Sequence, residues 1–310
     1  MVEGQAGLTW ERWFHILQTV ERLGIPSLFR SDHYVIGTPQ SSIDAYLSFA
    51  VAARETSNIR FGPLVNPMTF RSPVDIGRMA AQVNQLSNGR FLLGLGTGWH
   101  QPEHDAYGIY FPPIRERFDR LEEGINVIKT LWGSGPASYK GKHYSVTEVD
   151  CLPKPVSGAD TPILIGGSGP RRTMPLVAKY ADEWNCVNLP LGTYKERTEL
   201  VAQFCEDLDR DPATLHRSML RFGLIAGDDR SLDRLTRHHM NTSGATGSPE
   251  AYREALAKDR NFLVGLTNEV VDTLGKYEEL GVEEVQFEHF NFASDEFPEY
   301  LARELTPRVA

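Results

Sequence analysis

The chain has 310 residues, of which 41% are hydrophobic and 24% charged, with a net charge of −9 and a pI of about 5.5. This composition is typical of a globular protein with a large core, and the acidic balance predicts no basic face for nucleic acid. No apolar run approaches the roughly 20 residues that span a bilayer, and the first residues do not resemble a signal peptide. We therefore expect a cytoplasmic protein with neither a nucleic-acid nor a membrane partner.

Three cysteines, Cys151, Cys186 and Cys205, are widely and irregularly spaced. An odd number at such spacing forms neither a disulfide framework nor a metal-ligand cluster. We predict three free, buried thiols of the kind that persists in a reducing compartment.

Helical periodicity alternates with short β-rich runs along the chain. In chain order, we predict a helix over 10–23 with Thr9 and Gly24 at its ends, a strand over 25–29, a helix over 44–56 and a strand over 59–65. A helix over 73–86, a strand over 91–96 and a long helix over 114–132 follow. The second half continues with strand 162–165, helix 170–181, strand 184–189, helix 193–209, strand 219–226, helix 268–280, strand 284–287 and helix 295–304.

Strict alternation with nearly continuous apolar strands favours an α/β fold with a parallel sheet wrapped by helices. The units approach eight, which favours a single closed (β/α)₈ TIM barrel over residues 1–310. Before the first helix only residues 2–5 could serve as strand one, so we expect a short first strand. Residues 133–160 are expected to leave the barrel as an ordered excursion, and the polar, turn-rich residues 227–262 are expected to form a lid insertion.

In such a barrel the active site is built where strands hand over to helices. Four of these junctions have unusual sequences: Asp32-His33 after the second strand, Asn66 to Arg71 after the third, Gly96 to His100 after the fourth, and Gly166 to Pro170 after the fifth. The chemistry of the chain is therefore expected at these four places.

The junction after the fifth strand is rich in glycine. Backbone amides in a turn of this kind can approach an anion closely, Pro170 suits the first helical position, and Arg171 and Arg172 add positive charge. The turn therefore predicts a phosphate site, although a tight turn that needs several positive φ angles fits the residues equally well.

The junction after the fourth strand, Gly94 to Trp99, has glycines at alternate positions and lacks the spacing of a dinucleotide fingerprint. Small residues at this place would instead let a flat ring lie against the backbone. His100, Glu103 and His104 have the spacing of metal ligands, but Pro102 lies among them and no further ligand is evident, so we expect no metal site.

The pair Asp32-His33 has two interpretations. It could serve as an acid/base or hydrogen-bonding pair that faces a ligand. Taken alone, a helix-capping aspartate beside a surface histidine is the more common arrangement.

Six segments in this order and spacing resemble the bacterial luciferase-like superfamily of flavin and deazaflavin oxidoreductases: Leu23–His33, Leu64–Pro73, Leu86–Trp99, Phe118–Gly124, Pro162–Gly169 and Tyr180–Asn185. The resemblance runs from Gly4 to about His289. It is strongest to the branch that uses the deazaflavin coenzyme F420 rather than FMN.

The resemblance implies a set of cofactor-binding residues. It places a non-prolyl cis peptide at Leu64-Val65 behind the central ring of the cofactor, and it places Asp32 and His33 beside the ring, with His33 as the proton-transfer candidate. It assigns the phosphate to Gly166, Gly167, Ser168 and Gly169. The remaining implied cofactor contacts are Asn66, Gly96, Thr97, Gly98 and His100. In some deazaflavin dehydrogenases a glutamate proton donor stands where this chain has Trp99.

The implied function is hydride transfer between F420 and a small alcohol, imine or activated alkene, in a homodimer formed through the second and third helices. An FMN-dependent monooxygenase with a separate reductase partner is the second hypothesis, because both cofactors present a phosphate to the same turn. A barrel subunit without catalytic activity is the third.

Overall fold

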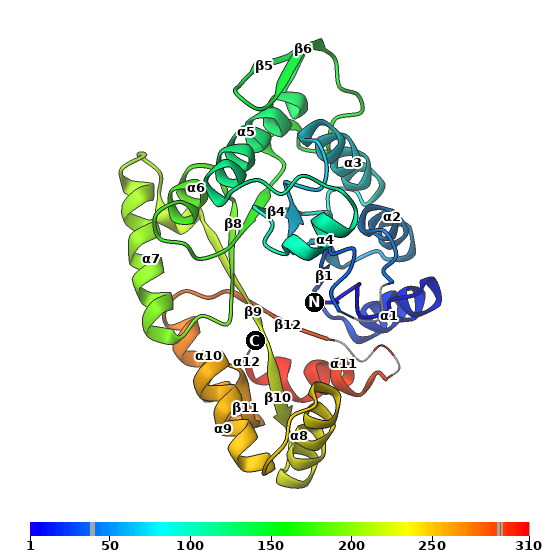
Figure 1. Ribbon diagram of the computed structural model, residues 1–310, viewed down its shortest axis with the longest axis vertical. Coiled ribbons are helices and arrows are strands. Elements are labelled where there is room, and N and C mark those ends of the chain that lie inside the picture. The colour runs from blue at the N-terminus through cyan, green and yellow to red at the C-terminus, as the bar shows by residue number, and fades with distance from the viewer. Residues whose placement is uncertain (38–40, 290–291, 293, 310) are drawn as a thin grey trace.

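The computed structural model, which describes residues 1–37, 41–289, 292 and 294–309, arranges short parallel strands inside a wrapping of helices (Figure 1). β1 (Ser27–Arg30) pairs with β2 (Arg60–Pro63), and a bridge between Phe61 and Phe91 joins β2 to the run that contains β4 (Leu93–Gly96). From β4 the parallel pairing continues through β7 (Ile163–Gly166), β8 (Glu183–Val187), β9 (His216–Arg221) and β12 (Glu284–Phe287).

The short first strand expected at residues 2–5 lies between β12 and β1. Val2 forms parallel bridges with both Arg30 and His289. Its N–H donates to the carbonyl of Phe29 at 2.8 Å, and its carbonyl accepts from Ser31 N–H at 3.0 Å. The bridges therefore join β12, the last strand, to β1 through Val2. The predicted α/β-barrel fold is confirmed.

The first helix begins and ends where local sequence signals predict. The predicted helix 10–23 is α1 (Trp10–Leu23), with Thr9 accepting from Arg12 N–H and Gly24 left-handed at φ 67°. The other predicted helices are α2 (Ala45–Glu55), α3 (Pro73–Leu86), α5 (Ile114–Trp132), α6 (Thr173–Tyr180), α7 (Leu191–Glu206), α10 (Thr267–Glu278) and α11 (Glu296–Tyr300). After α11 the chain continues as a π turn (Leu301–Leu305) and α12 (Thr306–Val309).

The segment after β9 differs from the prediction. The predicted strand 219–226 is divided at Phe222 into β9 and β10 (Gly223–Ala226), and β10 pairs in parallel with an unpredicted strand, β11 (Leu263–Leu266). The expectation of a turn-rich segment at 227–262 was wrong, because it contains α8 (Asp229–Ser243) and α9 (Pro249–Arg260). The polar sequence hid these helices because α8 buries only Leu232, Thr236 and Met240.

The excursion at 133–160 contains an antiparallel hairpin of β5 (Ala137–Lys140) and β6 (Ser145–Val149), which packs against α5. Figure 1 shows this hairpin at one end of the molecule and α8 with α9 at the opposite end. Two short elements that the sequence did not indicate lie near the strand ends: β3 (Asn66–Pro67) and α4 (Gln101–Ala106).

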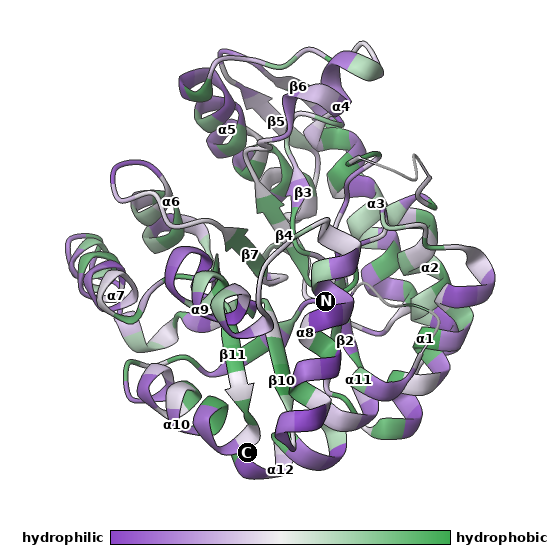
Figure 2. Cartoon of the chain, turned by 60° about the horizontal axis from the view of Figure 1, so that its bottom comes forward, coloured by the Kyte–Doolittle hydropathy of each residue, from purple (hydrophilic) through white to green (hydrophobic). Residues whose placement is uncertain are grey.

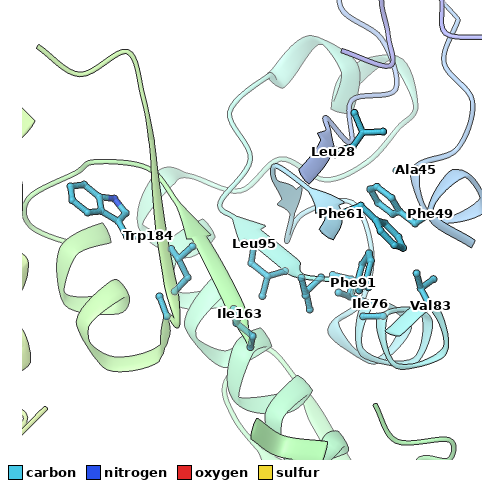
Figure 3. Close-up of a cluster of buried hydrophobic side chains, with 14 of the residues drawn as sticks. Leu28, Ala45, Phe49, Phe61, Ile76, Val83, Phe91, Leu95, Ile163 and Trp184 are labelled. Atoms are coloured by element: carbon cyan, nitrogen blue, oxygen red, sulfur yellow. The ribbon is translucent and has the colours of Figure 1, made fainter. Parts of the chain in front are cut away.

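The core lies between the barrel wall and the helices. Phe49, Phe61 and Phe91 pack edge to face or tilted, with ring centroids 5.4–6.3 Å apart (Figure 3). Hydrophobic residues concentrate in the strands, while the outer faces of the helices are largely hydrophilic (Figure 2). All three cysteines are buried and unpaired, as predicted. Over the described part of the chain, no helix is both long and apolar enough to cross a membrane.

Glu284 is the centre of a polar network at the amino-terminal ends of the strands. It accepts from Ser27 Oγ at 2.6 Å and Gln286 Nε2 at 2.9 Å, and it is ion-paired with Arg60. Burial raises the pKa of Glu284, but the neighbouring His216 and Arg60 outweigh burial and lower it to about 2. Its stabilising effect is therefore present above the pKa of an unfolded glutamate and is lost as the pH falls towards 2.

We expect Glu284→Gln to lower the free energy of unfolding by about 2 kcal/mol at pH 7, because charged hydrogen bonds of a half-buried group are lost. The measurement is urea denaturation, repeated at lower pH, where the difference from the wild type should shrink. Glu279→Gln, an exposed substitution at the end of α10, is the control. Equal stability of Glu284→Gln and wild type at pH 7 would contradict the role given to this network.

Candidate functional site

Asp32 lies two residues beyond the end of β1, and it is held by an arginine from the next unit. Arg71 donates to both carboxylate oxygens, at 2.5 and 3.1 Å, and the Asp32 side chain is almost fully buried. Burial raises the pKa of Asp32, and the charge of Arg71 opposes that shift. Asp32 caps no helix, so the capping interpretation was wrong.

Asn66, after β2, belongs to the same polar group. Its Oδ1 accepts from the hydroxyl of Tyr46 at 3.1 Å and lies 3.4 Å from Nη1 of Arg71. Asn66 is completely buried. Arg71 therefore joins the ends of β1 and β2, a function that the sequence did not reveal although Arg71 lies in one of the four unusual junctions.

His33 faces a buried glutamate. Its Nδ1 lies 2.8 Å from Oε1 of Glu103, and the other carboxylate oxygen accepts from the backbone N–H groups of Tyr34 and Val35 at 3.0 and 3.4 Å. Glu103 comes from α4, which lies near the ends of β1 and β4 (Figure 1). His104, which the metal interpretation grouped with Glu103, has a different partner. Its ring Nε2 lies 2.7 Å from Thr69 Oγ1.

An ionised carboxylate only accepts hydrogen bonds, so the N–H at Nδ1 of His33 donates a hydrogen bond to Oε1 of Glu103. The neutral imidazole therefore has its lone pair on Nε2, which makes no hydrogen bond to any residue in the described ranges. The rings of Trp99 and His100 lie edge-on to His33, with centroids 5.4 and 6.2 Å away. Trp99 is 67% exposed, while the His33 side chain is mostly buried beneath it, with 15% exposed.

The peptide bond between Leu64 and Val65 is cis, as the family resemblance implied. The side chain of Val65 extends over two other junctions. A Cβ added to Gly96 would lie 2.5 Å from Val65 Cγ2, and one added to Gly166 would lie 2.9 Å from Cγ1. A side chain at either glycine would overlap Val65, so the packing of Val65 is by itself a reason for glycine at both positions.

Gly98, beyond β4, is left-handed at φ 75°, and a Cβ there would lie 2.7 Å from Thr69 Oγ1. Its carbonyl accepts from Arg117, while Thr97 is half-buried beside it. His100 is the residue before α4, where its carbonyl accepts from His104 Nδ1 at 2.9 Å. The strand-four junction thus curves over the end of β1 and brings Trp99 and His100 to His33.

The carbonyl groups of the turn after β7 accept hydrogen bonds from other groups of the protein. Trp184 Nε1 donates to Gly167 O at 2.7 Å, and Arg197 Nε donates to Ser168 O at 2.9 Å. The carbonyl of Gly169 accepts from Thr173 N–H at 3.0 Å. Helix α6 begins at Thr173, so the expectation that Pro170 occupies its first position was wrong; Pro170 lies in the turn before it.

Most N–H groups of this turn, in contrast to its carbonyls, lack a hydrogen-bond partner in the described part of the protein. Within the described part of the chain, no protein acceptor contacts the N–H groups of Ser168, Gly169, Arg171 and Arg172. Gly167, at φ 126°, gives the turn a shape that other residues rarely adopt. Free amides at the start of a helix, with Arg171 exposed beside them, fit an anion such as a phosphate.

The candidate residues thus fall into two linked groups at the carboxyl ends of the strands. Arg71 connects Asp32 to Asn66, and Val65 connects Gly96 to Gly166. Nε2 of His33 and the amide N–H groups after β7 are the atoms at these strand ends that lack a protein partner among the described residues. No cluster of three or more metal-ligating side chains occurs among the residues that the structure describes.

A model of the luciferase-like monooxygenase family matches residues 2–284. The chain belongs to this family. Its sequence is 32% identical over 209 residues to an F420-dependent glucose-6-phosphate dehydrogenase of Amycolatopsis mediterranei, a match that covers 61% of this chain and 60% of that enzyme. It is 30% identical over 253 residues to an F420-dependent hydroxymycolic acid dehydrogenase of Mycobacterium tuberculosis, covering 79% of this chain and 67% of that enzyme.

A third relative is the pyrimidine monooxygenase RutA of Serratia proteamaculans, 32% identical over 157 residues, or 49% of this chain and 41% of that enzyme. Among solved structures, the F420-dependent tetrahydromethanopterin reductase of Methanopyrus kandleri matches with a TM-score of 0.80 at 19% identity, over 100% of this chain and 98% of its own. The oxygenating constituent of 3,6-diketocamphane monooxygenase of Pseudomonas putida, in complex with FMN, matches with a TM-score of 0.76 at 18% identity, over 98% and 95%. These two structures share the fold. The family is one of oxidoreductases that use a flavin or a deazaflavin.

We expect Gly96→Ala to destabilise the protein by about 1–3 kcal/mol, because its Cβ would overlap the methyl group of Val65. The measurement is a double-mutant cycle by urea denaturation with Val65→Ala, which removes the overlapping methyl groups. The double variant should lose less stability than the sum of the two single variants. Gly227→Ala, where an added Cβ meets nothing within 4 Å, is the control, and strict additivity of the cycle would contradict the proposed contact.

Proposed function

We propose that the chain is an F420-dependent oxidoreductase that moves a hydride between its cofactor and a small alcohol, imine or activated alkene. The proposal is supported by the two F420-dependent dehydrogenases with about one-third identical residues. The observation that carries it is the His33–Glu103 pair after β1, in which the second imidazole nitrogen, Nε2, has no hydrogen-bond partner among the described residues.

The residues present suit such a cofactor. The amides of Ser168 and Gly169 would bind its phosphate, and the Leu64-Val65 segment would support its ring beside Asp32 and His33. When bound, F420 supplies a carbon centre that gives or takes a hydride but does not activate oxygen. The protein contributes position and proton transfer.

His33 is the proposed proton carrier at Nε2. In alcohol oxidation, a neutral imidazole accepts the hydroxyl proton while the hydride leaves the adjacent carbon. In the reverse direction, the imidazolium returns that proton to the carbonyl oxygen. Glu103 keeps the proton on Nδ1 in the neutral form and stabilises the imidazolium by its charge, so the cycle needs no other acid in the protein.

The surroundings of His33 favour a substrate with an apolar portion. Tyr34 stacks on Phe70 at 4.4 Å, and the ring of Tyr107 lies edge-on to Tyr34 at 5.3 Å. With the exposed Trp99, these rings form an aromatic rim beside the proton carrier. Some deazaflavin dehydrogenases have a glutamate proton donor where this chain has Trp99, so a sugar phosphate would lack that donor here. We therefore propose an alcohol or enone with an apolar body as substrate class.

An FMN-dependent monooxygenase is the second candidate, favoured by the match to RutA over about half of the chain. It would need reduced FMN from a reductase partner. The experiment that separates the candidates is titration of the purified protein with F420 and, separately, with FMN, followed by quenching of tryptophan fluorescence. We expect binding of F420 at least tenfold tighter than binding of FMN. The reverse order would refute F420 dependence, and binding of neither would support a barrel without catalytic activity.

We expect Glu103→Gln to lower kcat by at least tenfold while leaving the Kd of the cofactor unchanged. Tyr34 N–H and Val35 N–H would select the amide oxygen of the glutamine, so its NH₂ group would face Nδ1 of His33. Nδ1 must then accept, and the proton moves to Nε2, where the lone pair is needed. The ¹⁵N spectrum of the labelled imidazole reports this change of tautomer.

The matched control is Asp105→Asn, an exposed acid-to-amide change in the same short helix, which should leave both kcat and the spectrum unchanged. If Glu103→Gln has the wild-type tautomer and the wild-type kcat, Glu103 does not position His33. If the tautomer changes and kcat does not, His33 Nε2 is not the proton carrier.

A further inference from the structure

The inner face of β9 continues beyond the barrel onto the face of the β10–β11 ribbon that α8 and α9 cover. Leu220 packs inside the barrel with Phe29 of β1, whereas the side chain of Arg221 points outward to α10. Side chains alternate along a strand, so Phe222 lies on the inner side again. Leu224, on that same side, packs with residues of α8 and α9. Figure 1 shows β10 as the continuation of β9, with α8 beside it.

A row of ring contacts leads from the mouth of the barrel into these two helices. Phe222 stacks on Phe262, the residue before β11, with ring centroids 5.2 Å apart. His239 of α8 lies edge-on to Phe262 at 6.3 Å, and the ring of Tyr252 of α9 lies 5.7 Å from His239. His239 is therefore connected to the inner face of the barrel by two packed aromatic rings.

The base of this row is fixed from the barrel side. Asn188, after β8, accepts through Oδ1 from Phe222 N–H at 3.0 Å, and its carbonyl accepts from Asn261 Nδ2 at 3.0 Å. Arg221 donates to the carbonyl of Asn261 at 2.9 Å. These bonds tie the backbone at both aromatic rings to the ends of β8 and β9. The row is thus held in the way that a ligand-binding wall requires.

The fold uses only one ring nitrogen of His239. Nδ1 lies 2.8 Å from the hydroxyl of Tyr252, which in turn lies 3.0 Å from Ser243 Oγ. Nε2 has no hydrogen-bond partner within the described ranges, and it is not among the buried atoms that lack one, so it is accessible. The link between α8 and α9 therefore accounts for Nδ1 but not for Nε2.

The charge state of His239 restricts what Nε2 can bind. Burial lowers the pKa of His239, and the charges of Arg260 and His238 lower it further, so the ring is neutral at pH 7. Tyr252 can donate to Nδ1 and accept from Ser243, or accept from Nδ1 and donate to Ser243. Nε2 is a donor in the first arrangement and an acceptor in the second. A hydroxyl group both donates and accepts, so it matches either arrangement.

We propose that His239 is a specificity-determining residue that binds a second hydroxyl group of the substrate through Nε2. The rings of Phe222 and Phe262 would contact the apolar part between the two hydroxyl groups. The inference rests on the proposed function, because it takes the reacting alcohol to lie at His33. His33 follows β1 and His239 lies beyond β9, with β12 and the segment at Val2 between these strands, so such a substrate crosses the mouth.

The kinetic experiment uses the F420-loaded protein and compares two diols, hexane-1,6-diol and octane-1,8-diol, with the matching mono-alcohols, 1-hexanol and 1-octanol. We expect His239→Leu to lower the ratio of kcat/KM for diol over mono-alcohol at least threefold for one pair, through KM, because a neutral hydrogen bond is lost. His239→Gln, whose amide can both donate and accept, should restore the ratio. The matched control is His238→Leu, an exposed neighbour in the same helix.

A second readout needs no F420. The same diols, added to protein labelled with ¹⁵N in its histidines, should shift the Nε2 resonance of His239, which is identified by its loss in His239→Gln. This measurement observes the wild-type chain, so it decides the inference even if His239→Leu does not fold.

The outcomes separate the inference from the proposed function. An unchanged diol ratio in an active, F420-loaded His239→Leu protein would overturn the role of His239 and leave the oxidoreductase function in place. A shift of the Nε2 resonance without turnover of F420 would support the hydroxyl site and refute the proposed function. Absence of the shift with both diols would overturn the inference.

Discussion

The packing of Val65 against two glycines sets the spacing of the strands at the mouth of the barrel. Its methyl groups occupy the space where Gly96 and Gly166 would carry a Cβ. One layer deeper, Gly62 and Gly94 face the backbone carbonyls of Leu92 and Pro63 in the same way. Side chains at these positions would force the strands apart. Since each junction residue follows directly from one of these strands, the geometry of the whole site depends on this contact.

Asp32 and Glu103 are two buried carboxylates within that mouth, and they have different hydrogen-bond partners. Asp32 is paired with Arg71 at both oxygens, which neutralises its charge and fixes the relation of β1 to β2. Glu103 has no arginine or lysine partner within the described ranges and is held by two backbone N–H groups and His33. Its charge is therefore available to the imidazole alone. Asp32 therefore links two strand ends, and Glu103 fixes the position of the His33 ring through its hydrogen bond.

The sequence predicted which residues gather at the mouth but not how they pair. Parallel strands bring all their carboxyl ends to one rim, so locating the strands was enough to collect Asp32, Asn66, Gly96 and the turn after β7. Arg71 lies 39 residues from Asp32 and Glu103 lies 70 residues from His33, and no local pattern encodes such pairs. Helix α8 was missed for a related reason: its sequence is mostly polar, and the few residues it buries are too sparse to give a clear apolar stripe.

The hydrogen-bond partners of the polar groups differ between the two ends of the strands. At the amino-terminal end, Glu183 accepts from Arg60 and from Ser218 Oγ at 2.5 Å each, and Glu284 collects the donors described above. At the carboxyl end, the amides after β7 and Nε2 of His33 have no acceptor or donor among the described residues. A buried polar group without a partner is costly, so a fold retains such groups only where solvent or a ligand completes them. The amide N–H groups after β7 and Nε2 of His33 are therefore the polar atoms at the mouth whose hydrogen bonds a ligand or solvent would complete.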